Sequence, residues 1–241
     1  MDNSLFVGLS RQETLQRALE ITANNIANAD TAGFKLEQLL VQADPATPPV
    51  PDAPTVAYVL DTGVTRDFTQ GEMERTGNAY DLAIDGPGFF QVQTAAGLRY
   101  TRDGRFGVNT ANQLVTKAGD PVLDTGGRPI TLDPNLPEPA IAKDGTVSQG
   151  AANLGRIGVF RFADLSVLQK DGGNLFQSGV TPTAAPDAVI RAGSVEHSNV
   201  KPVVEITNLI EITRAYERVA QMMSQTSDLS ERAVDRLGKA A

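Results

Sequence analysis

Residues 202–223 read PVVEITNLIEITRAYERVAQMM, and large apolar side chains return along this stretch at the spacing of an α-helix. Such a stripe predicts a helix that packs against another helix. The pattern weakens through Ser227 and Ser230, so we expect a helix from about Ser198 to about Leu237. The first and fourth positions of a seven-residue repeat hold Ile206, Leu209, Thr213, Tyr216, Ala220 and Met223. A second stripe, which one partner helix would not cover, consists of Ile212, Val219, Met222 and Leu229.

The amino-terminal residues carry a similar stripe. Residues 24–28 hold three asparagines, which are poor interior helix formers, and residues 30–33 read DTAG, a turn signal. We therefore expect a helix from about Ser4 to about Ala29. Two helical ends that each need an apolar partner are expected to pack together. The repeat positions hold Leu5, Leu15, Leu19, Thr22, Ile26 and Ala29, with breaks at Gly8 and Gln12.

Five prolines lie between residues 45 and 54. Proline fixes a backbone angle and removes an amide donor, which favours an extended linker over a strand or a helix. We therefore expect four parts: an amino-terminal helix in residues 1–35, an extended linker region in 36–80, a β-rich domain in 81–195 and a carboxyl-terminal helix in 196–241.

Short strand patterns and turn signals fill residues 56–195. Asp103-Gly104 and Asp144-Gly145 each stand between apolar segments, and Asp-Gly supplies the positive backbone angles of a tight hairpin turn. No alternation of strands and helices appears, which argues against a parallel nucleotide-binding sheet. The predicted fold class is α+β: N- and C-terminal α-helices packed together as a coiled-coil-like layer, with a mainly antiparallel β central domain.

Composition excludes several classes of function. The 241 residues carry a formal net charge of −8 and are 41% hydrophobic, which suits a globular protein and disfavours binding to nucleic acid or to an anionic membrane. We expect no cleavable secretory signal at the amino end and no membrane-spanning stretch. The sequence has no cysteine, so disulfides and thiolate chemistry are excluded.

An aspartic protease is the enzymatic alternative, because Val-Leu-Asp-Thr-Gly occurs twice, with carboxylates at Asp61 and Asp124. The spacing leaves little room for a complete protease lobe, and the flanking residues do not recur, so the match lacks its structural context. His197 is the only histidine, which excludes a multi-histidine metal site. We expect no catalytic residue, metal site or cofactor.

A freestanding α+β binding module is the other alternative, in which both helices simply pack on the β body. Polar residues interrupt the two helical stripes and would weaken an isolated pair, which favours assembly with further copies. The interrupting residues are Gln12, Thr22, Thr213 and Ser227.

Three ordered motifs occupy the amino end, the middle and the carboxyl end of the chain. Residues 23–35 read ANNIANADTAGFK, which is similar to the amino-terminal signature of the rod and hook proteins of the bacterial flagellum, the FlgE, FlgF and FlgG group. Residues 77–92, GNAYDLAIDGPGFFQV, with YTRDGRF at 100–106 and LVT at 114–116, look like its central stretch. Ser198-Asn199-Val200 and residues 214–217, RAYE, match its carboxyl-terminal signature. Residues 1–12 and the modest length look most like the FlgF members, and the FlgG members are the nearer rival.

The resemblance implies a non-enzymatic structural subunit of the periplasmic rod in the flagellar basal body, which assembles helically and carries torque. In that family the terminal helices form an inner layer and the β-rich middle an outer layer. The implied partners are copies of the chain, other rod proteins and the flagellar type III export apparatus. The asparagine amides of residues 24, 25 and 28 are expected to bond helix backbones or neighbouring subunits. The expected assembly interface consists of Leu15, Leu19, Ile26, Ile206, Leu209, Tyr216 and Met223.

Overall fold

The computed structural model describes residues 3–46 and 56–239. The chain divides into two compact units, which are treated separately below. The helical unit comprises Met1–Ala27, Glu37–Asp67 and Lys201–Ala241, and the β unit comprises Asn28–Leu36 and Phe68–Val200. Each unit is therefore built from segments that are far apart in the sequence.

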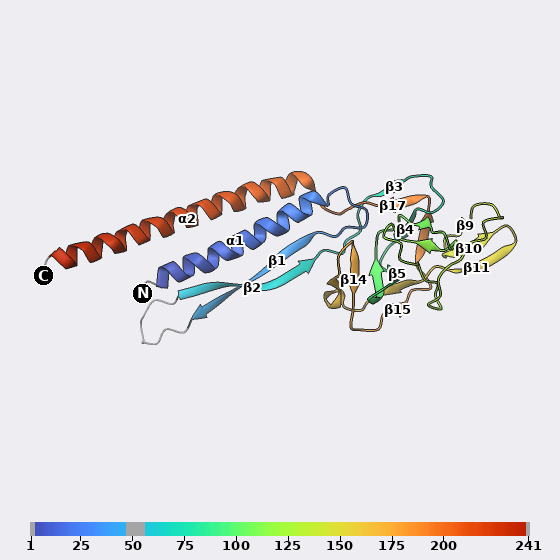
Figure 1. Ribbon diagram of the computed structural model, residues 1–241, viewed down its shortest axis with the longest axis horizontal. Helices are drawn as coiled ribbons and strands as arrows, with labels where there is room; N and C mark the ends of the chain where they lie inside the picture. The colour runs from blue at the N-terminus through green and yellow to red at the C-terminus, as the bar shows by residue number, and fades with distance from the viewer. Residues whose placement is uncertain (1–2, 47–55, 240–241) are drawn as a thin grey trace. The chain divides into compact units, whose positions relative to one another are not determined.

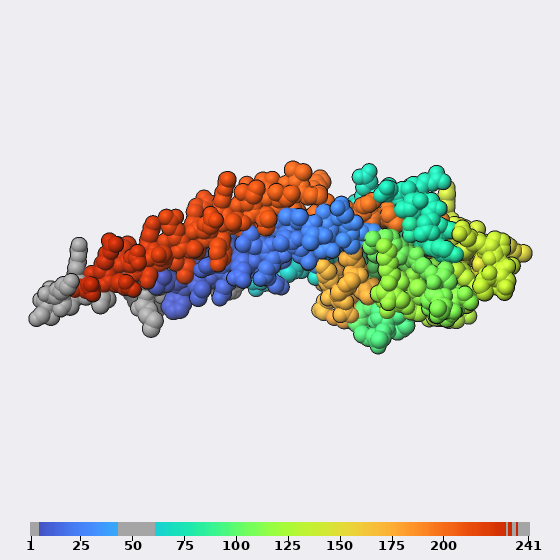
Figure 2. Space-filling model, turned by 45° about the horizontal axis from the view of Figure 1, so that its top comes forward, coloured from blue at the N-terminus to red at the C-terminus, as the bar shows by residue number. Residues whose placement is uncertain are grey.

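Two long helices dominate the helical unit. Helix α1 (Asn3–Ala27) and helix α2 (Pro202–Lys239) lie side by side and run in opposite directions (Figures 1 and 2). Proline is tolerated in the first turn of α2 because the amide it lacks would have no partner there. Both predicted helices and their pairing are confirmed, and α1 ends two residues before Ala29. A coiled-coil geometry for the pair stays a prediction.

A β-hairpin belongs to the same unit, where the proline content predicted an extended linker. Strand β1 (Glu37–Ala46) pairs antiparallel with β2 (Val56–Arg66), with a register shift between Leu40 and Val41. Pro45 is tolerated because it lies near the end of β1 in a two-stranded sheet, where a missing amide costs little. The other four prolines fall in residues 47–55, outside the described residues. The expectation of a linker was therefore wrong for residues 37–46 and 56–66.

The β unit contains a six-stranded sheet with the order β13-β14-β6-β5-β12-β15, and all its pairs are antiparallel. Its strands are β5 (Phe89–Thr94), β6 (Gly97–Thr101), β12 (Val159–Arg161), β13 (Gln169–Lys170), β14 (Leu175–Gln177) and β15 (Thr183–Ala184). Smaller ladders use β3 (Met73–Arg75), β4 (Leu82–Asp85), β7 (Gly107–Val108), β8 (Leu114–Val115), β9 (Ala140–Ile141), β10 (Thr146–Gln149), β11 (Ala152–Arg156), β16 (Val189–Ala192) and β17 (Ser194–Glu196), and a short 3-10 helix spans Leu165–Val167. The predicted α+β class is confirmed.

Strand β5 separates two apolar clusters, because successive side chains of a strand point to opposite faces. Phe90 lies in the larger core, where its ring packs edge to face against that of Phe106 with the ring centroids 5.1 Å apart. Phe89 lies in an aromatic cluster with Phe176, where the ring centroids are 6.0 Å apart. The β unit therefore has its own hydrophobic core.

One of the two predicted hairpins is confirmed. Strands β9 and β10 pair around Asp144-Gly145, and Gly145 has the positive φ of 87° that such a turn requires. Asp103-Gly104 does not connect a hairpin, because β6 pairs with β5 and β14 while β7 pairs with β8. Gly104 instead permits a close backbone crossing: a Cβ there would lie 1.6 Å from the carbonyl oxygen of Leu82.

The Gly33-Phe34-Lys35 motif is anchored inside the β unit. A Cβ on Gly33, whose φ is +69°, would lie 2.4 Å from the amide nitrogen of Asp103, so only glycine fits. The amide of residue 36 donates to Asn199 Oδ1 at 2.8 Å. Motifs from the two ends of the sequence therefore meet at one place.

Glu196 ties these segments together with a buried carboxylate. Its Oε1 accepts from Lys35 Nζ at 2.5 Å and from the amide of Gly71 at 3.1 Å, and its Oε2 accepts from the Arg102 guanidinium at 3.1 Å. The side chains of Lys35 and Glu196 are 1% and 0% exposed. Two cations therefore share one carboxylate away from water, a geometry in which losing the anion is costly.

Glu196→Gln is expected to lower the free energy of unfolding of the β unit by about 3–5 kcal/mol, because it leaves Lys35 and Arg102 as uncompensated buried charges. Urea denaturation followed by circular dichroism measures the change. The matched control is Glu74→Gln, which removes a carboxylate exposed beside His197 and should cost less than about 1 kcal/mol. Equal losses in the two variants would show that the Glu196 network does not hold the unit together.

No helix within the described parts of the chain, residues 3–46 and 56–239, is long and apolar enough to cross a membrane.

Candidate assembly interface

The seam between α1 and α2 uses the two breaks in the amino-terminal stripe. Gly8 is buried, and a Cβ there would lie 2.8 Å from Met223 Cγ, so the missing side chain makes room for the methionine. Gln12 Nε2 lies 2.8 Å from the Tyr216 hydroxyl, to which it donates a hydrogen bond. Gly8 and Gln12, which interrupt the apolar repeat, are thus the residues that contact Met223 and Tyr216 of α2.

The predicted interface residues all lie in the helical unit, but with different burial. Leu15 is 5% exposed, whereas Ile206 at the start of α2 is 46% exposed. The half-buried members are Leu19, Ile26, Leu209, Tyr216 and Met223. The structure brings Tyr216 and Met223 against α1 within one chain. Contacts of all seven with neighbouring subunits stay a prediction.

Asn25 joins three elements of the helical unit. Its side chain is 1% exposed; Nδ2 donates to the Glu37 carbonyl at 2.8 Å and to Glu205 Oε2 at 3.0 Å, while Oδ1 accepts from the Glu37 amide at 3.0 Å. One amide thereby links the end of α1 to the start of β1 and the first turn of α2. Asn25 was expected to bond helix backbone or a neighbouring subunit, but within the chain it bonds the backbone of Glu37 in β1 and the side chain of Glu205.

A groove follows the two helices and changes charge along its length. One stretch has Leu15 and Ile212 among its apolar lining, with basic side chains from Arg11, Arg214 and Arg218 beside Glu211 and Glu217. The next stretch, beside β1, is lined by the carboxylates of Glu37, Glu205 and Glu211. Linings that mix charged and apolar side chains suit a protein partner rather than a small apolar ligand.

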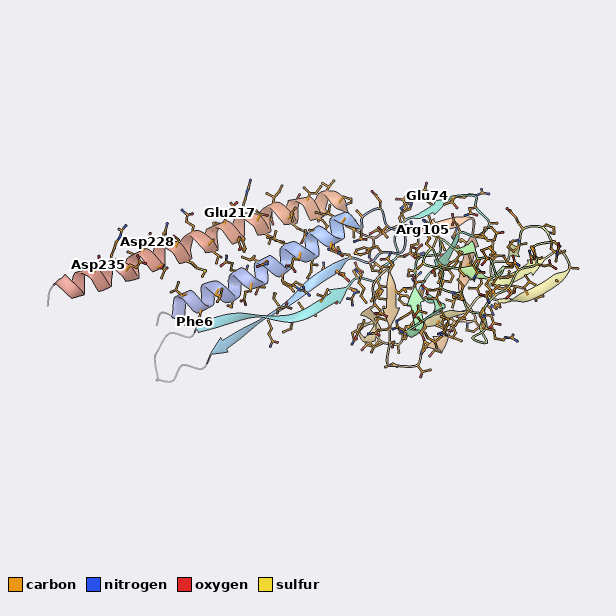
Figure 3. All side chains as sticks on the ribbon, viewed as in Figure 1. Phe6, Glu74, Arg105, Glu217, Asp228 and Asp235 are labelled. Carbon is orange, nitrogen blue, oxygen red and sulfur yellow. The ribbon has the colours of Figure 1, made fainter. Side chains whose placement is uncertain are left out.

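Large apolar side chains remain exposed on both helices and on the hairpin. The second stripe of α2 is only partly covered, since Met222 and Leu229 are 52% and 66% exposed. Figure 3 places Glu217, Asp228 and Asp235 along the outer side of the same helix. Clusters of exposed apolar groups indicate interaction surfaces. Their other members are Phe6, Leu9, Leu40, Val41, Val203, Val204, Ile206 and Ile210.

The two Asp-Thr-Gly aspartates each accept hydrogen bonds from backbone amides a few residues further along the chain. Burial alone would raise the pKa of Asp124, but the amides of Arg128 and Gly126 and the Arg128 guanidinium hold that pKa below its usual value. Asp61 belongs to the other compact unit and accepts from the amide of Gly63 at 2.9 Å. A protease dyad shares one proton and so needs a raised pKa on one carboxyl. The environment of Asp124 has the opposite effect.

The close contact of Gly8 with Met223 should appear as an energetic coupling. Gly8→Ala gains about 0.5–1 kcal/mol of helix propensity, but in the native chain the clash with Met223 should cancel that gain. In a Met223→Ala background the same change should raise the free energy of unfolding by about 1 kcal/mol. Urea denaturation followed at 222 nm measures all four proteins of the cycle.

Met222→Ala is the matched background, because Met222 is exposed on the same helix. Gly8→Ala should behave there as it does in the native chain. If Gly8→Ala changes the free energy of unfolding equally in the Met222→Ala and Met223→Ala backgrounds, the contact is refuted.

Models of three families match successive parts of the chain. "Flagella basal body rod protein" matches residues 5–35, "Flagellar hook protein FlgE/F/G D1 domain" matches 83–149, and "Flagellar basal body rod FlgEFG protein C-terminal" matches 191–236. These are the regions that carry the three sequence motifs.

Full-length relatives agree with the family models. The chain is 57% identical to the flagellar basal-body rod protein FlgF of Caulobacter vibrioides and 37% identical to that of Mesorhizobium japonicum, in each case over 99% of both chains. It is 33% identical to the flagellar basal-body rod protein FlgG of Buchnera aphidicola subsp. Schizaphis graminum, over 89% of this chain and 92% of the relative. The chain therefore belongs to the FlgE/FlgF/FlgG family of flagellar rod and hook proteins and matches FlgF rod proteins along nearly its whole length.

Proposed function

We propose that this chain is a structural subunit of the flagellar basal-body rod, which assembles helically through α1 and α2 and transmits torque across the periplasm. The observation that carries the proposal is that two paired helices leave large apolar side chains uncovered on both. A subunit that completes its burial only against neighbours is stable as part of a polymer.

The two compact units suggest a division of labour within the rod. The terminal helices, in residues 1–35 and 196–241, form the inner layer, and the β-rich residues 81–195 form the outer layer. The β1–β2 hairpin packs with the helices in one compact unit, so we assign it to the inner layer rather than to a connecting linker. Because the β unit has its own core and a buried ion pair between Lys35 and Glu196, we expect it to keep its shape under load.

The interface within the inner layer is proposed to use side chains of both helices, so that each subunit contacts copies of itself and other rod proteins. The members are Leu15, Leu19, Ile26, Ile206, Leu209, Tyr216 and Met223. The chain is further proposed to reach the periplasm through the flagellar type III export apparatus. An unfolded chain without disulfides suits passage through a narrow channel. The role requires neither a catalytic residue nor a cofactor.

A distal-rod role like that of FlgG is the alternative within the family. The higher identity to proteins named FlgF, 57% against 33% for a protein named FlgG, favours the FlgF-like role. Imaging basal bodies from a strain that lacks this chain separates the two. Loss of the distal part of the rod alone, with every more proximal segment present, would favour the FlgG-like role.

Leu19→Asp is expected to block incorporation into the rod while the β unit stays folded, because it places a charge in a half-buried apolar seam and costs more than about 2 kcal/mol there. Immunoblots of purified basal bodies and swimming assays measure the loss, and limited proteolysis reports on the β unit. The control Ala23→Asp puts the same charge at an exposed site one turn later and should be incorporated. Normal motility of the Leu19→Asp strain would contradict the proposed role of this seam.

A further inference from the structure

Residues 32–36, which we call the strap, are buried in the β unit. Ala32, Phe34 and Lys35 are 3%, 2% and 2% exposed. In the sequence the strap follows α1 and precedes β1, whereas the residues that bond it lie in residues 69–199. The strap is therefore held by distant parts of the chain, as a peptide ligand is held by a receptor.

Hydrogen bonds to the main chain hold the strap along its length. Asn174 Nδ2 donates to the first carbonyl of the strap at 3.0 Å, and the amide of Gly33 donates to the Glu196 carbonyl at 2.8 Å. The last amide of the strap donates to Asn199 Oδ1 at 2.8 Å. Bonds of this kind provide affinity for a peptide backbone.

Three successive positions of the strap are each recognised by a different contact. A Cβ on Gly33 would lie 2.4 Å from a backbone nitrogen, so the position admits only glycine. The ring of Phe34 lies under Lys170, whose Nζ is 4.7 Å from the ring centroid, a cation–π geometry. Lys35 Nζ donates to the buried carboxylate of Glu196 at 2.5 Å. The contacts therefore select glycine, an aromatic residue and lysine in that order.

The apolar clusters and the main sheet of the β unit come from other residues. The two clusters consist of side chains from residues 68–190, and the six strands of the sheet lie in residues 89–184. Glu196 keeps a cation if Lys35 moves into water, because the Arg102 guanidinium lies 3.1 Å from its carboxylate. Departure of the strap therefore leaves the clusters, the sheet and a paired carboxylate in place.

We propose that Lys170, Asn174, Glu196 and Asn199 form a peptide-binding slot for a glycine–aromatic–lysine segment. The strap fills this slot in the folded chain, and it can leave and re-enter while the rest of the β unit stays folded. Because the slot is built from residues 170–199, a chain in which this part has not folded leaves its strap undocked. The inference concerns the β unit of a single chain and does not depend on the proposed function in the rod.

Hydrogen exchange of the native chain tests whether the strap opens separately. The amides of Gly33 and Leu36 should have protection factors about tenfold or more below those of β5 and β6, with little dependence on dilute urea, because a local opening exposes little surface. Mass spectrometry of peptic fragments measures both quantities. Equal protection and equal urea dependence would show that the strap opens only when the whole unit unfolds, and would overturn the inference.

A labelled peptide tests the slot itself. Gly33→Ala forces a Cβ against backbone atoms and Lys35→Glu places a second carboxylate beside Glu196, so each should release the strap in the full-length chain. Fluorescence anisotropy should then show binding of a fluorescein-labelled peptide of residues 28–37, NADTAGFKLE. The native chain should bind this peptide about tenfold or more weakly, because its own strap is tethered beside the slot.

Two matched controls isolate the recognition. Gly127→Ala imposes a similar backbone strain, at a φ of +77°, where a Cβ meets open space. Its strap should stay protected, and the peptide should bind no better than to the native chain. A peptide that carries Lys35→Gln should bind the released chain about tenfold more weakly, because it loses a charged hydrogen bond to Glu196.

Three further results would overturn the inference. Release of the strap in both variants without peptide binding would show that the slot recognises no separate peptide. Equal affinity for the native and the Lys35→Gln peptide would show that the lysine is not recognised. Unfolding of the β unit in both Gly33→Ala and Lys35→Glu, with Gly127→Ala folded, would show that the unit cannot stay folded with its slot empty.

Discussion

The antiparallel pairing of α1 with α2 is the constraint on which the rest of the molecule depends. It joins segments separated by most of the sequence, so the intervening chain has to leave the helical unit and return to it. Closing so long a loop costs conformational entropy, which the helix seam and its ties must offset. Asn25 is such a tie, because one buried amide satisfies the backbone of Glu37 and the carboxylate of Glu205. Its bonds fix where α1 ends and where α2 begins.

Inside the β unit, a buried ion pair likewise joins segments that are far apart in the sequence. Lys35 comes from the amino-terminal motif and Glu196 from just before the carboxyl-terminal motif. Lys35 Nζ lies 2.5 Å from Glu196 Oε1, and both side chains are buried away from water. Arg102 of the central motif completes the cluster. Removing one member of a buried pair of this kind is costly, because it leaves the other charge uncompensated away from water. Residues from or next to all three sequence motifs thus meet in one polar cluster.

Sequence periodicity was enough to predict both helices and their pairing, because large apolar side chains at helical spacing must find a partner. Sequence periodicity did not predict that Gly8 contacts Met223 and that Gln12 contacts Tyr216. An interruption in an apolar stripe does not indicate which residue of the partner helix packs there. Asp144-Gly145 made the expected hairpin, but Asp103-Gly104 did not, because that glycine serves a tertiary crossing against Leu82. The proline-rich segment led to the prediction of a linker in place of the β1–β2 hairpin. The strands that form this hairpin lie on either side of the prolines after Pro45. Contacts such as Lys35 with Glu196 join positions too distant for any local pattern.

The two units differ in how completely each buries its own apolar surface, and this difference bears on assembly. In the β unit the largest aromatic side chains lie in closed clusters. In the helical unit aliphatic groups such as Ile206, Ile210 and Leu229 remain exposed, and covering one of them fully is worth about 1.5–3 kcal/mol. One such contact is too weak to hold two free copies together, because association has its own entropic cost. Several contacts for each copy, repeated with neighbours whose positions are already fixed, exceed that cost. A chain that buries the apolar surface of its β unit but leaves apolar surface of its helical unit exposed can therefore stay separate in solution and still become stable in a polymer.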